Sequence, residues 1–197
     1  MKNKILTTLA VIGFAVAAQA TPVVFSFLEN GSNLALGSSS TFTEGGVSIT
    51  AYAGPGDTLY AKNLGVGSET GLGLTSDPSG QHEITPGRFI QLGLPTTPIT
   101  TLSLVFLTSV TAGSETATIW FSAVQGVLGA QIGTVASEAS FDVSAYTSGY
   151  IGISAGAGNV LVESLHADLR TPDGGSTMLL MGGALTALGL IRRKLAV

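Results

Sequence analysis

One stretch of the sequence has the residue types and spacing of a nucleophilic active site. Gly152-Ile-Ser154-Ala-Gly156 matches the G-x-S-x-G pattern, and His166 and Asp168 lie downstream of it. In hydrolases this serine needs a sharp turn between a strand and a helix, and the triad acid precedes the histidine. Here Ser154 is followed by small residues and a second strand-like run, and His166 precedes Asp168. We therefore expect no catalytic residues and no enzyme activity, and a secreted hydrolase is the last alternative.

The residues that could bind a metal ion are scattered. The two histidines, His82 and His166, are too far apart to form a zinc site by spacing, and His82-Glu83 lacks the second histidine of HExxH. Several carboxylates lie near glycine-rich turns, but no Asp-x-Asp-x-Asp-Gly calcium loop occurs. We expect no cofactor. The alternative is a structural calcium ion, with Asp77 and Glu83 as its first candidate ligands.

The C-terminal residues 171–197 fall into three parts. Residues 171–176 hold a short motif, residues 177–191 are apolar and uncharged, and residues 192–197 begin with a basic cluster. The motif residues are Pro172, Asp173, Gly174 and Gly175, and the basic cluster is Arg192, Arg193 and Lys194. A proline disfavours helix in the residue before it, and glycines leave the backbone extended. The motif is therefore suited to entering the active site of a protease or transpeptidase.

The apolar residues 177–191 predict a short transmembrane helix. Fifteen residues span about 22 Å at 1.5 Å per residue, whereas the hydrocarbon core is about 30 Å thick, so the flanking arginines must snorkel. The basic cluster predicts a cytoplasmic C-terminus and leaves the motif on the exported side. A sorting tail is the interpretation we favour. The alternatives are a plain C-terminal anchor and an amphipathic or core helix.

The N-terminal residues 1–20 predict a signal peptide. Lys2 and Lys4 precede an apolar run from Ile5 to Ala18, and Ala18-Gln19-Ala20 fits the small-x-small pattern before a signal peptidase site. We expect the mature chain to begin at Thr21. The alternative is an uncleaved signal anchor.

Between these ends, residues 21–170 are long enough for one domain with a hydrophobic core. The chain has no cysteine, so an exported domain must be stabilised without disulfides. The body holds three basic residues against eleven carboxylates, a net charge of −8. Nucleic-acid binding requires lysines and arginines that neutralise phosphates, so we expect no nucleic-acid partner.

The body has the sequence pattern of an antiparallel β-sandwich or jelly roll of about ten strands. Its apolar runs are short, rich in β-branched and aromatic residues, and bounded by turn residues, and none has the period of a helix. The predicted strands are 22–28, 40–52 with a turn at Glu44-Gly-Gly46, 59–62, 88–94, 102–107, 116–121, 131–135, 140–143, 150–154 and 159–169.

A signal peptide, a β-rich body, Pro172-Asp-Gly-Gly175, an apolar helix and a terminal Arg-Arg-Lys together resemble the PEP-CTERM class of exported bacterial proteins. The tail more narrowly resembles the VPDSG-CTERM variant, from which it departs at Thr171 and Gly174. Segments such as Gly71-Leu-Gly-Leu74 and 88–94 are similar to the β-sandwich domains that precede such tails. The resemblance implies processing by exosortase, a membrane-embedded enzyme of bacteria that make extracellular polysaccharide.

From these patterns we expect a non-catalytic protein that passes through the inner membrane and ends at the cell surface or in the extracellular matrix. Extracellular polysaccharide is a further expected partner. The alternative function is a glycan-binding module at the cell surface. Its large amphipathic rings would be Tyr52, Tyr60, Trp120, Tyr146 and Tyr150. An exposed row of these rings on one sheet face would favour glycan binding, whereas their burial would favour a structural role.

Overall fold

Alternating apolar and hydroxyl-bearing residues form the strands of the body. In the strand Val47–Ala53, for example, Val47, Ile49 and Ala51 are buried, while Ser48 between them is exposed. Successive side chains of a strand point to opposite faces of its sheet, so this pattern gives one face to the core and one to solvent. The computed structural model describes residues 21–27, 33–64, 69–95, 99–108, 115–136, 139–169 and 182–183.

The described part of the body contains thirteen strands. They are β1 (Thr21–Ser26), β2 (Leu34–Gly37), β3 (Ser39–Glu44), β4 (Val47–Ala53), β5 (Leu59–Asn63), β6 (Thr70–Leu74), β7 (Phe89–Gly93), β8 (Ile99–Thr108), β9 (Thr116–Ser122), β10 (Ala130–Ala136), β11 (Ser140–Asp142), β12 (Tyr150–Ala157) and β13 (Val160–Leu169).

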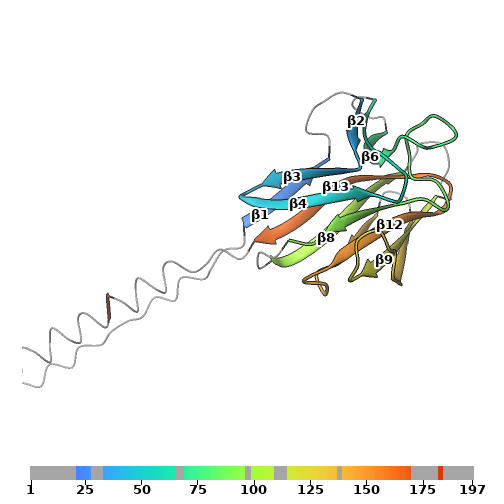
Figure 1. Ribbon diagram of the computed structural model, residues 1–197. Helices are drawn as coiled ribbons and strands as arrows, with labels where there is room; N and C mark the ends of the chain where they lie inside the picture. Colours follow the sequence, from blue (N-terminus) through green and yellow to red (C-terminus); the bar gives the residue numbers. More distant parts are fainter. Residues whose placement is uncertain are drawn as a thin grey trace, which may run out of the picture. The chain divides into compact units, whose positions relative to one another are not determined.

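The strands form two antiparallel sheets, which we call sheet A and sheet B (Figure 1). Sheet A has the order β11-β8-β13-β6-β5-β2. The strand β6 pairs with β13 only at Val162, and β1 pairs with the following part of β13, from Ser164 to Leu169. Sheet B has the order β10-β9-β12-β7-β4-β3. The chain passes from sheet B to sheet A between β12 and β13, so Ser154 and His166, which are close in the sequence, lie in different sheets.

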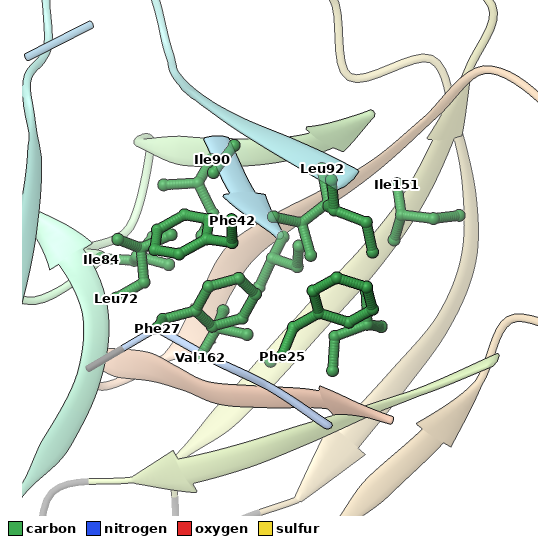
Figure 2. Close-up of a cluster of buried hydrophobic side chains, with 14 of the residues drawn as sticks. Phe25, Phe27, Phe42, Leu72, Ile84, Ile90, Leu92, Ile151 and Val162 are labelled. Atoms are coloured by element: carbon green, nitrogen blue, oxygen red, sulfur yellow. The ribbon is translucent and has the colours of Figure 1, made fainter. Parts of the chain in front are cut away.

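The inner faces of both sheets share one hydrophobic core, as in a β-sandwich (Figure 2). Phe25 of β1 and Val162 of β13 come from sheet A, and Ile90 of β7 comes from sheet B; all three are fully buried. The rings of Phe27 and Phe42 meet edge to face, with centroids 4.9 Å apart. Burying one such side chain stabilises the fold by about 1.5–3 kcal/mol, which explains how the body can fold without disulfides.

The sequence prediction of an all-β body is confirmed, and its strand count was too low. The turn predicted at Glu44-Gly-Gly46 separates β3 from β4, with Gly45 and Gly46 both at positive φ, as a two-residue hairpin loop requires. The strands β2 and β6 were not predicted. Within the ranges that the structure describes, no helix is long and apolar enough to cross a membrane. The predicted signal peptide and, apart from Gly182 and Gly183, the predicted span 177–191 lie outside these ranges.

Candidate functional site

Ser154 of the G-x-S-x-G match lies within a strand and not on a turn. Its neighbours Ile153 and Ala155 belong to the core, so the Ser154 side chain lies on the outer face of sheet B. There its Oγ accepts a hydrogen bond from Trp120 Nε1 at 2.9 Å. A methyl group on Gly152 would come within 2.9 Å of Leu128 and 3.2 Å of Trp120. The small residues of this motif therefore allow close packing of Trp120 and Leu128 over β12.

His166 lies on the opposite side of the sandwich from Ser154. Its neighbours Leu165 and Ala167 are in the core, and the exposed His166 side chain is on the outer face of sheet A. Its Nε2 is 3.1 Å from Ser164 Oγ, two residues away on the same strand. Because the hydrophobic core separates Ser154 from His166, these two side chains cannot form a nucleophile–base pair in this fold.

The candidate calcium ligand Asp77 binds the backbone of its own loop. Its carboxylate accepts hydrogen bonds from Ser79 N at 2.8 Å, Ser79 Oγ at 2.6 Å and Gln81 N at 3.0 Å. Burial alone would raise the pKa of Asp77, but the bonds from Ser79, Glu83 N and Gln81 outweigh burial and hold that pKa below its ordinary value of 3.8. Asp77 therefore stays ionised and shapes the loop between β6 and β7.

The other candidate ligand, Glu83, belongs to a buried ionic cluster with Lys62 and Glu69. Lys62 Nζ is 2.7 Å from Glu83 Oε1 and also pairs with Glu69. The side chains of Lys62 and Glu83 are each 3 % exposed. Asp77 and Glu83 therefore each have donors within the chain. Across the described ranges, no three histidine or acidic side chains come together in a way that could hold a metal ion.

The cluster has one cation for two carboxylates, and the pKa values reflect this imbalance. Burial and the nearby Glu69 carboxylate raise the pKa of Glu83 above its ordinary value of 4.5, although Lys62 acts in the opposite direction. Burial would lower the pKa of Lys62, but its bonds to Glu69 and Glu83 raise it above 10.5. Lys62 is therefore charged at neutral pH, and both carboxylates share its ammonium group.

His82 is held in the same loop by stacking. Its ring stacks on the ring of Tyr60, with centroids 3.9 Å apart and an interplanar angle of 24°. The φ of His82 is 60°, which is unusual for a residue other than glycine. A methyl group on Gly73 of β6 would overlap the His82 carbonyl group. The loop between β6 and β7 therefore rests directly on the outer face of β5 and β6, and this contact covers Tyr60.

The outer face of sheet B carries a groove that no motif in the sequence predicted. It has a volume of about 470 Å³, and its lining includes Tyr52 of β4, Tyr150 of β12 and Gly93 of β7. The two tyrosine rings meet edge to face, with centroids 5.9 Å apart, and both are half-buried. Ser48 and Thr50 add hydroxyl groups to the lining. The alternation of β4 would have placed Ser48, Thr50 and Tyr52 on one face.

Two other rings of the set, Trp120 and Tyr146, contact neighbouring side chains of the body. Trp120 is half-buried on the outer face of sheet B, where its N–H group donates a hydrogen bond to Ser154 Oγ. Tyr146 stacks on Phe121 at 4.7 Å and packs against the core. Tyr52 and Tyr150 are the two rings of this set that line the groove on sheet B.

The predicted sorting residues fall outside the described ranges. This holds for Ala18 and Ala20 at the predicted signal cleavage site, for the motif residues 172–175 and for the basic residues 192–194. Their roles stay predictions. The last described strand, β13, ends at Leu169, three positions before Pro172.

The comparisons with known proteins bear on the tail. No curated protein matches the chain. Residues 172–195 match the family model of the VPDSG-CTERM motif, which covers the motif, the apolar segment and the basic cluster. The match leaves the β-rich body unassigned. It agrees with the resemblance seen in the sequence and implies processing by an exosortase-type system. The chain thus carries a C-terminal sorting motif of the VPDSG-CTERM class.

Proposed function

We propose that this protein is a non-catalytic, exported surface or extracellular-matrix protein whose C-terminal sorting signal is processed by an exosortase. The match of residues 172–195 to the VPDSG-CTERM motif carries this proposal. Signal peptidase would remove residues 1–20. The apolar segment 177–191 would then hold the chain in the inner membrane, with residues 192–197 in the cytoplasm, until processing releases the body.

The body supports a non-catalytic role. Ser154 and His166 lie on opposite faces of the sandwich, and Ser154 accepts a hydrogen bond from Trp120. Calcium is no part of the proposal, because Asp77 and Glu83 are already engaged by hydrogen-bond and ionic partners within the chain. The net charge of −8 on the body also makes nucleic acid an unsuitable partner.

Replacement of the motif in the native host tests the proposal. The double variant Pro172→Ala/Asp173→Ala leaves the apolar segment and the basic cluster unchanged, so export and membrane insertion should continue. We expect the uncut protein to accumulate in the inner membrane, with less protein at the surface and in the medium. The double variant Ser176→Ala/Thr177→Ala, which leaves the four motif residues intact, provides the matched control. Unchanged mass and location of the double variant would show that the motif is an ordinary linker before a plain anchor.

One observation favours a second candidate function, glycan binding. Tyr52 and Tyr150 stand together in an open groove of sheet B, beside the hydroxyl groups of Ser48 and Thr50. Such a module would retain the released body in extracellular polysaccharide.

A further inference from the structure

We propose that the groove between Tyr52 and Tyr150 binds a neutral saccharide chain. This inference rests on the second candidate function and assigns it a site and a ligand class. The site lies on the outer face of sheet B, because the residues that flank these tyrosines along their strands, Ala51 and Ile151, are in the core.

The two rings provide the apolar surface that a sugar requires. A tyrosine presents a ring face that packs against the C–H groups of a sugar, and a hydroxyl group that exchanges hydrogen bonds with sugar hydroxyls. Tyr52 and Tyr150 lie edge to face at an interplanar angle of 72°. Each ring therefore supports the other, and little side-chain freedom is lost when a ligand binds.

Beneath the two rings, the lining of the groove includes a glycine, Gly93, which has no side chain to occupy it. Gly93 of β7 pairs with Thr50 of β4 on one side and with Tyr150 of β12 on the other. A methyl group at Gly93 would lie 3.4 Å from the Tyr52 ring and 3.7 Å from the Tyr150 ring, in ordinary contact with both. A larger side chain there would fill the groove without straining the backbone.

The hydroxyl groups beside the rings keep hydrogen-bonding capacity for a ligand. Ser48 Oγ pairs with Thr43 Oγ1 at 2.7 Å, and Thr50 Oγ1 pairs with Thr41 Oγ1 at 2.9 Å. A hydroxyl group has one donor and two lone pairs, so each pair uses one donor and one lone pair and retains the rest. The pairing also holds these hydroxyls in position before a ligand arrives.

The groove is lined, among the residues that the structure describes, by uncharged side chains. It therefore has no cation to compensate the carboxylate or sulfate groups of an acidic polysaccharide, and the body as a whole has a net charge of −8. Burying an uncompensated charge is costly, whereas uncharged sugar hydroxyls can be satisfied by the hydroxyl groups present. The ligand chemistry that fits is that of a neutral saccharide.

The neighbouring loop gives the groove a fixed wall. The fully buried Gln91 side chain donates to Val127 O at 2.7 Å and accepts from Gly126 N at 2.6 Å, and Ala123 of the same loop lines the groove. This loop covers one part of the outer face of sheet B and leaves the part between Tyr52 and Tyr150 open.

Binding by the full-length chain tests the proposal. The protein is kept in a polyoxyethylene detergent, because detergents with sugar headgroups would compete. Isothermal titration would use cellohexaose, laminarihexaose, xylohexaose and dextran as neutral probes and oligogalacturonate as the acidic probe. We expect at least one neutral probe to bind and oligogalacturonate not to bind. Tyr52→Ala, Tyr150→Ala and Gly93→Val should each weaken binding at least about tenfold, equivalent to about 1.4 kcal/mol.

Tyr60→Ala is the matched control, because Tyr60 stacks on His82 on the outer face of the other sheet. It should bind as the wild-type chain does. Thermal unfolding identifies any variant that has lost its fold, and Gly93→Val keeps the test valid if an alanine variant is unstable. The proposal is overturned if no neutral probe binds, if only oligogalacturonate binds, or if the three groove variants bind like wild type. Since binding is measured on unprocessed protein, none of these results depends on exosortase processing.

Discussion

Thr21 and Leu169 are directly paired at the end of the β1–β13 ladder. Thr21 is the expected first residue of the mature chain, and Leu169 is the last residue of β13. Both ends of the folded body therefore leave the same end of sheet A. Only Arg170 and Thr171 separate this ladder from the sorting motif at Pro172.

The short distance from the ladder to the motif predicts that spacing controls processing. Deleting Arg170 and Thr171 would bring Pro172 next to a residue that is paired in the sheet, and a processing enzyme needs an extended, unpaired segment. We expect pulse–chase labelling to show slower conversion of this variant to the mature form. Insertion of Gly-Ser-Gly-Ser at the same place is the control and should leave conversion unimpaired. Equal rates for the deletion variant and the wild type would contradict this dependence on the ladder.

The buried ionic cluster predicts very different costs for two substitutions. Lys62→Met leaves Glu69 and Glu83 without their shared cation, so the free energy of unfolding should fall by about 3–5 kcal/mol at pH 7. Glu83→Gln keeps a hydrogen-bond acceptor for Lys62 and leaves one cation with one carboxylate, so its cost should be much smaller. Urea denaturation of both variants measures the two losses of unfolding free energy. A larger loss for Glu83→Gln than for Lys62→Met would contradict the prediction and make Glu83 the essential member of the cluster.

The lowered pKa of Asp77 predicts a loss of stability in acid. A carboxyl group whose pKa is lower in the folded state stabilises the fold above its ordinary value of 3.8, and this contribution disappears as the pH falls through the folded-state pKa. Glu83, whose pKa is raised, acts in the opposite direction, because its contribution weakens as the pH rises above 4.5. We expect Asp77→Asn to flatten the pH dependence of the unfolding free energy below pH 3.8. A variant that loses stability in acid as steeply as the wild type would assign that loss to other groups.

The position of Ser154 predicts that its removal has a structural effect alone. In Ser154→Ala, the Trp120 N–H group loses its 2.9 Å partner, so the unfolding free energy should fall by about 1 kcal/mol. Hydrolysis of p-nitrophenyl esters should be equally low for the variant and the wild type. A serine-dependent esterase activity in the wild type would refute the non-catalytic interpretation.

The sequence predicted the parts of the fold that depend on local pattern. The hairpin at Gly45 and Gly46 follows from turn chemistry, and the inward positions of β4 follow from alternation. The strand β6 was missed because its residues Gly71 and Gly73 lower β-propensity. The structure shows why glycine is needed there: a methyl group on Gly71 would lie 2.7 Å from the Val162 carbonyl oxygen. This contact comes from tertiary packing, which no local pattern reports.

The candidate sites show the same division. Alternation places Tyr52 and Tyr150 on the outer faces of their strands, but they meet only because β7 lies between β4 and β12 and carries a glycine at position 93. Lys62 was part of a predicted strand, and nothing in that strand distinguishes a buried lysine from an exposed one. Ser154 of the G-x-S-x-G match lies within β12, which continues to Ala157, so Ser154 is not on the turn that a nucleophile elbow needs. That the chain is non-catalytic stays a prediction.

Mass spectrometry of the mature protein from its native host would show whether the sorting signal is processed, because it reports both ends of the chain at once. We expect a chain that begins at Thr21 and has lost the apolar segment 177–191 together with the basic cluster 192–194. A mature, exported chain that still ends at Val197 would contradict processing of the sorting signal and would make the tail a permanent anchor.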